Sequence, residues 1–294
     1  MARDRNLRRI KELNPVTDHC EIYHLTTGYE FPWDIRRALE IALFRTFCVP
    51  SISALLDRTG EFYHRPQKRY DDTTLIITRI AAWGYDSDRG REAIERMNRI
   101  HSRFQISNED FLYVLSLFIY EPIRWNERFG WRLMCENEKQ AAFYFWQALG
   151  ERMHIHNIPD TYEAFQRYSQ DYEKEHFNFS EANRRIGEAT RNLLLSWFPR
   201  PLRPTVEAGF YALLDNTMRQ AFGFPAPPKQ LSYAIETALK LRGRALRWFP
   251  PRKRPGFYSD TPTRSYPNGY TIEDLGPPSE THENEMTEVA KESA

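Results

Sequence analysis

Apolar residues along this chain recur mostly at steps of three and four, the spacing that places them on one face of a helix. Between Pro32 and Cys48 such a stripe passes through Ile35, Leu39 and Leu43. Strand-like alternation of apolar and polar residues is scarce, so the pattern predicts an all-α fold. The predicted helices cover residues 32–48, 51–56, 68–83, 88–104, 111–130, 136–149, 159–176, 180–198, 206–222 and 230–248.

The helical pattern also sets the predicted domain boundaries. Residues 1–14 form a charged N-terminal extension, and residues 15–252 form one multi-helix domain. The segment 199–204, with its prolines, is predicted to be a rigid connector. From residue 253 onward Pro, Ser, Thr, Glu, Asn and Gly replace the periodic apolar residues, so we predict a disordered tail over residues 253–294.

Charge and cysteine content exclude several classes of protein. The chain has 41 Lys and Arg against 40 Asp and Glu, and a net charge of +1 argues against a nucleic-acid-binding protein. Three cysteines without a CxxC motif indicate neither a disulfide framework nor a zinc knuckle. The charged N-terminus is unlike a secretory signal, and no uncharged apolar stretch of about 18 residues predicts an integral membrane segment. We therefore expect a cytoplasmic protein, with peripheral membrane contact left open.

Two polar residues interrupt the apolar face of the predicted helix 68–83. Arg69 and Thr73 lie four positions apart and therefore share that face with Ile76 and Ile80. One interpretation is that Arg69 extends to water while Thr73 hydrogen-bonds within its own helical turn. The other is that both side chains point into a pocket and contact a ligand anion or bound oxygen, because buried polar groups need partners.

His101 is the main candidate for a ligand of a metal cofactor. It follows Ile100 and lies four residues after Met97, on the predicted buried side of its helix. Such a histidine is often an ordinary core residue, but haem iron commonly takes one histidine surrounded by apolar walls. The aromatic residues that could line such a pocket or simply fill the core are Trp83, Phe104, Phe111, Tyr113 and Phe118.

Three acidic residues near Arg69 are weaker candidates. Asp71 and Asp72 are interpreted as solvated acids of the first helical turns, where they favour the helix dipole. Glu61 precedes the same helix and is a speculative general base. The plainer interpretation makes Glu61 a solvent-facing acid in a turn.

Several of these segments together resemble the mpaB and rubber-oxygenase catalytic-domain family. The resemblance is carried by KRYDDTTLII from Lys68, by Gly84, and by EAIERMNRIH, which ends at His101. The family pattern is an arginine and a threonine four apart, a helix ended by glycine, and a later Ile-His pair. Residues 130–150, the proline-rich segment 198–204 and residues 213–225 match later parts of the pattern, so the resemblance spans roughly residues 15–250.

The resemblance implies a globin-reminiscent helical fold that binds haem b, with His101 as the proximal iron ligand. Arg69 and Thr73 would lie beside the haem, where Arg69 would pair with a propionate or stabilise charge on bound oxygen. Relatives cleave carbon–carbon double bonds of isoprenoid chains with dioxygen. The implied function is a haem-dependent oxygenase that acts on an apolar, isoprenoid small molecule.

The chain departs from the rubber-cleaving relatives at one position. There a lysine immediately before the threonine can reach the iron, whereas here that position is Asp72, which implies a different distal side. Two rival interpretations remain. A haem-binding carrier or sensor would use the same histidine without catalysis, and a helical binding module without metal would use His101 only structurally.

Overall fold

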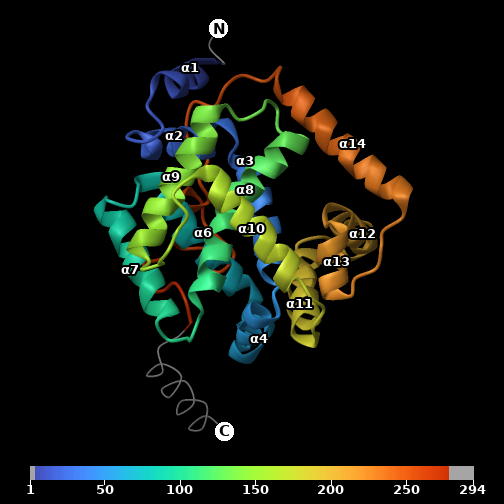
Figure 1. Cartoon of the computed structure of the whole chain (residues 1–294). Coiled ribbons are helices and arrows are strands. Elements are labelled where there is room, and N and C mark those ends of the chain that lie inside the picture. The colour runs from blue at the N-terminus through green and yellow to red at the C-terminus, as the bar shows by residue number, and fades with distance from the viewer. Residues whose placement is uncertain (1–3, 278–294) are drawn as a thin grey trace.

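The computed structural model describes residues 4–277, which form α-helices, short 3-10 and π-helical segments, and no strand (Figure 1). This confirms the all-α prediction. The α-helices are α1 (Arg5–Glu12), α2 (His19–His24), α3 (Pro32–Thr46), α4 (Pro50–Thr59), α5 (Glu61–His64), α6 (Pro66–Trp83), α7 (Asp88–His101), α8 (Asn108–Phe129), α9 (Glu136–Arg152), α10 (Tyr162–His176), α11 (Glu181–Ser196), α12 (Arg203–Leu213), α13 (Asn216–Phe222) and α14 (Lys229–Leu246). The π-helix is η2 (Leu25–Glu30), and the 3-10 helices are η3 (Arg200–Leu202) and η4 (Tyr258–Asp260).

Helix α8 is the central element of the fold. It packs against α3, α9, α10 and α14, which surround it in Figure 1. Its long apolar run predicts this position, because a helix that is apolar on most sides needs neighbours on most sides. Ser107 begins the helix by accepting a hydrogen bond from the Asp110 amide at 3.0 Å, as expected of an N-terminal cap.

A tight turn at Gly84 folds α7 back against α6. Gly84 has a φ of 76°, a conformation that favours glycine. A Cβ atom on Gly90 would lie only 1.9 Å from the Gly84 carbonyl oxygen, so the close approach of the two segments requires glycine at position 90. Arg69 lies 15 residues before Gly84 and His101 lies 14 residues after Ser87. At roughly 1.5 Å per residue, the two side chains reach the same end of the helix pair.

The predicted helix 206–222 is two helices. Asp215 interrupts it and caps α13 by accepting a hydrogen bond from the Met218 amide at 2.9 Å. The apolar periodicity continues across the break. The Asp215 carboxylate, however, accepts a hydrogen bond from one of the backbone amides that have no partner within the helix at the start of α13. The preceding segment 199–204 is helical over much of its length, since η3 and the start of α12 fall within it.

The first part of the predicted disordered tail is ordered. Residues 253–277 pack on α6 and α7 and bury Phe257, Ile272 and Leu275. We call this segment the C-terminal strap. The rest of the predicted tail, 278–294, lies outside the described residues. At the other end, the described part of the predicted N-terminal extension forms α1 and packs on the domain, since Ile10 is fully buried.

Within residues 4–277 no individual helix is long and apolar enough to cross a membrane. Helices α3 and α4 satisfy such a criterion of length and composition only when taken together, across a bend of 97°.

Candidate functional site

His101 ends α7 as a partly buried imidazole without a hydrogen-bond partner. Its Nδ1 atom is buried, and neither ring nitrogen bonds to any group within residues 4–277. The edge of the Phe111 ring faces it, with the ring centroids 5.3 Å apart. A buried nitrogen without a hydrogen-bond partner lowers the stability of the folded chain. A ligand that bonds to this imidazole would restore that stability.

The surroundings of His101 keep its imidazole neutral. Burial and the nearby Arg69 guanidinium lower the pKa of His101 from 6.5 to about 4. An imidazole without a proton on one nitrogen retains the lone pair that binds a metal. In the unfolded chain the His101 imidazole takes up a proton near pH 6.5, whereas in the folded chain it does so only near pH 4. His101 therefore lowers the stability of the fold as the pH falls from 6.5 towards 4.

Arg69 is a cation without a matching anion. It forms no ion pair in the described part of the chain, and its guanidinium lies 5.6 Å from the centre of the Phe62 ring. Burial lowers the pKa of Arg69, and the more distant Asp72 and Glu61 offset this only in part. A partly buried guanidinium that faces a neutral histidine is a suitable partner for an anionic group of a ligand.

Thr73 makes the hydrogen bond within its own helical turn that one of the two interpretations predicts, while its contact with a ligand stays a prediction. Its hydroxyl donates to the Arg69 carbonyl oxygen at 3.0 Å, which is the bond within its own helical turn. The hydroxyl oxygen of Thr73 also accepts a hydrogen bond from the Arg69 guanidinium. Thr73 therefore orients Arg69, and α6 brings these two residues together opposite His101 on α7.

Glu61 is engaged by a neighbour in the chain. Both of its carboxylate oxygens lie near the Arg65 guanidinium, at 2.5 and 3.1 Å. This arrangement suits an acid with a structural role in the turn before α6. The role of Glu61 as a general base stays a prediction.

Asp71 and Asp72 are not solvated, which corrects the sequence interpretation. Their exposed fractions are 0% and 4%. Asp71 accepts hydrogen bonds from the Tyr258 hydroxyl and the Ser265 amide, both at 2.9 Å. The strap covers these carboxylates, and a sequence interpreted as a disordered tail offered no reason to expect that.

Asp72 serves as an anchor for the strap. Its carboxylate accepts bonds from Lys68 and from the Gly276 amide, both at 2.9 Å, and from the Tyr266 hydroxyl. The strap then passes beside the residue before His101, since a Cβ on Gly276 would lie 2.5 Å from Ile100. With three donors on its carboxylate, Asp72 holds the strap against α6.

Loss of the Asp72 carboxylate will release the strap. We expect Asp72→Ala to lower the free energy of unfolding by about 2–3 kcal/mol, because it leaves buried donors unpaired. Trypsin will also cut after Arg264 much faster. Asp88→Ala, which removes an exposed acid of the adjacent helix, is the matched control. Unchanged cleavage in Asp72→Ala would show that the carboxylate does not hold the strap.

The predicted aromatic walls are only partly in place. Phe111 lies against His101, but Trp83 is 52% exposed beneath Arg89. Tyr113 belongs to a separate cluster, stacked on Tyr172 at 4.7 Å. Phe118 stacks on Trp146 at 4.4 Å, within the main core.

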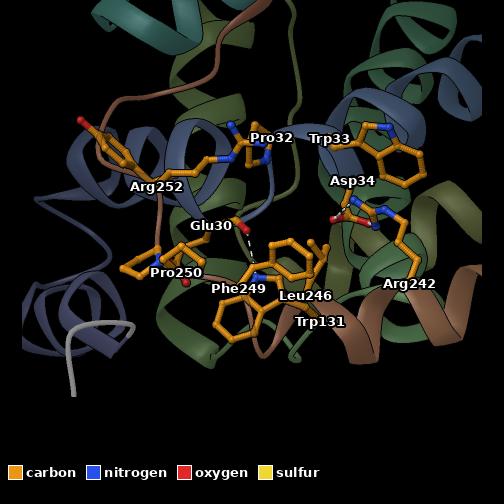
Figure 2. Close-up of a pocket in the computed structure, with 12 residues that line it drawn as sticks. Glu30, Pro32, Trp33, Asp34, Trp131, Arg242, Leu246, Phe249, Pro250 and Arg252 are labelled. Carbon is orange, nitrogen blue, oxygen red and sulfur yellow. Dashed lines mark hydrogen bonds and ion pairs between the residues drawn. The ribbon is translucent and has the colours of Figure 1, made fainter.

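A separate pocket of about 240 Å³ lies between η2, the start of α3 and the end of α14 (Figure 2). Trp33 and Trp131 contribute aromatic surface, and Arg242 stacks 3.5 Å above the Trp33 ring while pairing with Asp34 at 2.8 Å. None of the residues identified as candidates from the sequence lines it. Within residues 4–277, no group of three or more His, Cys, Asp or Glu could hold a metal ion.

The sequence of this helical chain matches one class of protein. A profile of the family described as "ER-bound oxygenase mpaB/B'/Rubber oxygenase, catalytic domain" matches residues 35–248. The chain therefore belongs to this family, which confirms the resemblance found in its sequence.

Two fungal proteins illustrate the relationship. The chain is 31% identical to the "ER-bound oxygenase mpaB'" of Penicillium brevicompactum over 243 residues, which are 76% of this chain and 57% of that protein. It is 30% identical to the "ER-bound oxygenase mpaB" of Penicillium roqueforti (strain FM164) over 220 residues, 68% of this chain and 74% of that protein. The chain thus spans little more than half the length of the first relative.

Proposed function

We propose that this chain is a haem b-dependent oxygenase that uses dioxygen on an apolar, unsaturated substrate of the isoprenoid type. Membership of a family of oxygenase catalytic domains supports the reaction class. The observation that carries the cofactor assignment is His101, whose buried Nδ1 has no partner and whose pKa is lowered to about 4. A neutral imidazole with a free nitrogen is the kind of donor that haem iron commonly takes as an axial ligand.

The residues around His101 fit a haem by their chemistry. His101 would hold the iron, and Arg69 would meet an anionic group, since it forms no ion pair with a carboxylate of residues 4–277. Thr73 would keep the guanidinium in place through the hydrogen bond that joins them. Bound haem iron would supply the dioxygen chemistry that side chains lack.

Arg69 would also set the electrostatics of the reaction. Its positive charge favours developing negative charge nearby and disfavours protonation of His101. The Phe111 ring covers part of the same imidazole. The relatives are named as ER-bound, and a cytoplasmic location for this chain stays a prediction.

Oxygen uptake tests the proposed reaction. Haem-reconstituted protein should consume dioxygen with an unsaturated isoprenoid alcohol and not with its fully saturated analogue. Arg69→Met should slow uptake by about 100-fold, the usual effect of removing one group that stabilises transition-state charge. Arg89→Met, which alters an exposed arginine of α7, is the control.

The same measurement separates the oxygenase from the rival haem carrier or sensor. A protein that binds haem but consumes no dioxygen with any unsaturated substrate would favour the carrier. Uptake that is equal in Arg69→Met and wild type would contradict the role of Arg69 and leave the cofactor assignment standing.

A further inference from the structure

The end of α14 and the loop after it form a strongly basic segment. Residues 240–256 contain seven Lys and Arg and no Asp or Glu, although the net charge of the whole chain is only +1. Figure 1 shows α14 at the edge of the molecule, away from the α6–α7 pair. We call residues 240–254 the α14 rim.

Most of the cations in the α14 rim lack a neutralising acid. Lys240 pairs with Glu236, and Arg242 pairs with Asp34. The Arg247 guanidinium donates only to the Trp131 carbonyl oxygen, at 2.7 Å. The others, which are exposed and form no ion pair within residues 4–277, are Arg244, Arg252, Lys253 and Arg254.

Large apolar side chains lie among these cations. Trp248 is 89% exposed, Phe249 is 61% exposed and Leu241 is 53% exposed. Exposed apolar residues clustered in this way mark interaction surfaces. Tryptophan in particular is enriched where one side of the ring meets lipid and the other meets water.

The apolar part of the α14 rim continues into the pocket shown in Figure 2. Leu246, Phe249, Pro250 and Arg252 from the rim form one side of that 240 Å³ pocket. Trp131 lies beside Leu246 and Phe249 in Figure 2 and also lines the pocket. The surface therefore combines protruding aromatic side chains, unpaired cations and a hollow between them.

We propose that the α14 rim binds the surface of an anionic lipid bilayer. Trp248 and Leu241 enter the interfacial region, while Arg252, Lys253 and Arg254 meet lipid phosphates and carboxylates. A bilayer of acidic lipids offers an apolar interfacial region for the tryptophan and negatively charged headgroups for the cations. A nucleic acid would match the charge and could stack a base on Trp248, but it would leave Leu241 without apolar contact.

Vesicle co-sedimentation of the full chain tests the proposal. Binding to vesicles that contain phosphatidylserine should exceed binding to pure phosphatidylcholine vesicles and should weaken as salt is raised. Replacing Arg252, Lys253 and Arg254 together by glutamine should weaken binding by about 100-fold, and Trp248→Ser by about tenfold. These side chains are exposed, so the variants should retain the wild-type circular dichroism.

Matched controls lie on other surfaces of the chain. Phe179→Ser removes an apolar side chain that is 53% exposed beside Gly223, and Lys174→Gln removes an exposed cation; both should bind vesicles as the wild type does. The proposal is wrong if acidic vesicles bind no better than neutral ones, or if the rim variants bind unchanged. It is equally wrong if a single-stranded RNA oligonucleotide binds more tightly than acidic vesicles and Trp248→Ser has no effect on either.

Discussion

Replacing Arg45 by methionine will lower the free energy of unfolding by about 3 kcal/mol, the lower end of the range for breaking a buried ion pair. Arg45 is 9% exposed at the end of α3. It pairs with Glu121 of α8 at 2.9 Å and with Glu173 of α10 at 2.8 Å, and also with Asp215, the cap of α13. Although burial alone would lower it, these three carboxylates raise the pKa of Arg45.

The size of this effect follows from what the substitution leaves behind. Methionine fills the space of the alkyl chain but leaves Glu121 and Glu173 without their main cation. The Arg124 guanidinium remains 2.5 Å from the Glu121 carboxylate and 3.5 Å from the Glu173 carboxylate. It limits the loss in free energy of unfolding to about 3 kcal/mol. Urea unfolding followed by circular dichroism measures it.

Two further variants make the Arg45 experiment decisive. Adding Glu121→Gln and Glu173→Gln to Arg45→Met should recover part of the lost stability, because the uncompensated charges are then gone. Arg184→Met, which removes an exposed arginine paired with Glu181 on the surface of α11, should change little. A loss in Arg45→Met no greater than that in Arg184→Met would show that the buried network does not stabilise the fold.

Replacing His101 by alanine will remove haem binding. Loss of a residue that merely supports a metal ligand costs about 10–100-fold in affinity, so loss of the ligand itself should cost more than about 100-fold. Added imidazole should restore part of the Soret absorption by entering the space left by the side chain. His156→Ala, which removes an exposed histidine, should bind haem as the wild type does.

The lowered pKa of His101 also predicts how haem binding depends on pH. Because burial and Arg69 hold its pKa near 4, the Soret band of the wild type should stay constant between about pH 6 and 8, where a histidine of ordinary pKa titrates. A band that falls as pH decreases from 8 to 6, together with full binding by His101→Ala, would assign the iron ligand elsewhere.

The sequence predicts the helices that position the candidate site. Gly84 ends α6, Ser87 caps α7, and the two helices have similar lengths, so an antiparallel pair brings Arg69 and His101 to one end. The side chains that these helices bring together are therefore predictable from local signals. That no carboxylate among the described residues forms an ion pair with Arg69 depends on the tertiary structure, and local sequence signals do not predict it.

The C-terminal strap was beyond local sequence signals. Its proline and polar content is typical of disorder, and its order depends on Asp71 and Asp72 of α6, which bond to Tyr258, Ser265 and Tyr266. The tyrosines and apolar residues between 257 and 275 are the one local feature that favours an ordered segment. Burial of two adjacent aspartates follows from this long-range contact, not from the position of the acids in the helix.

The break between α12 and α13 shows a different reason for error. The apolar stripe of residues 206–222 passes through the break, so periodicity alone predicts one helix. Asp215 caps α13 and also pairs with Arg45. The ion pair with α3 supplies a tertiary interaction that favours the break over a continuous helix.

The absorption spectrum of the purified wild-type protein after addition of haem tests the central claim most directly. We predict a Soret band that follows the protein through gel filtration at one haem per chain and is lost in His101→Ala. A wild-type protein that stays colourless after reconstitution, while it remains folded by circular dichroism, would contradict haem ligation and make His101 a structural residue.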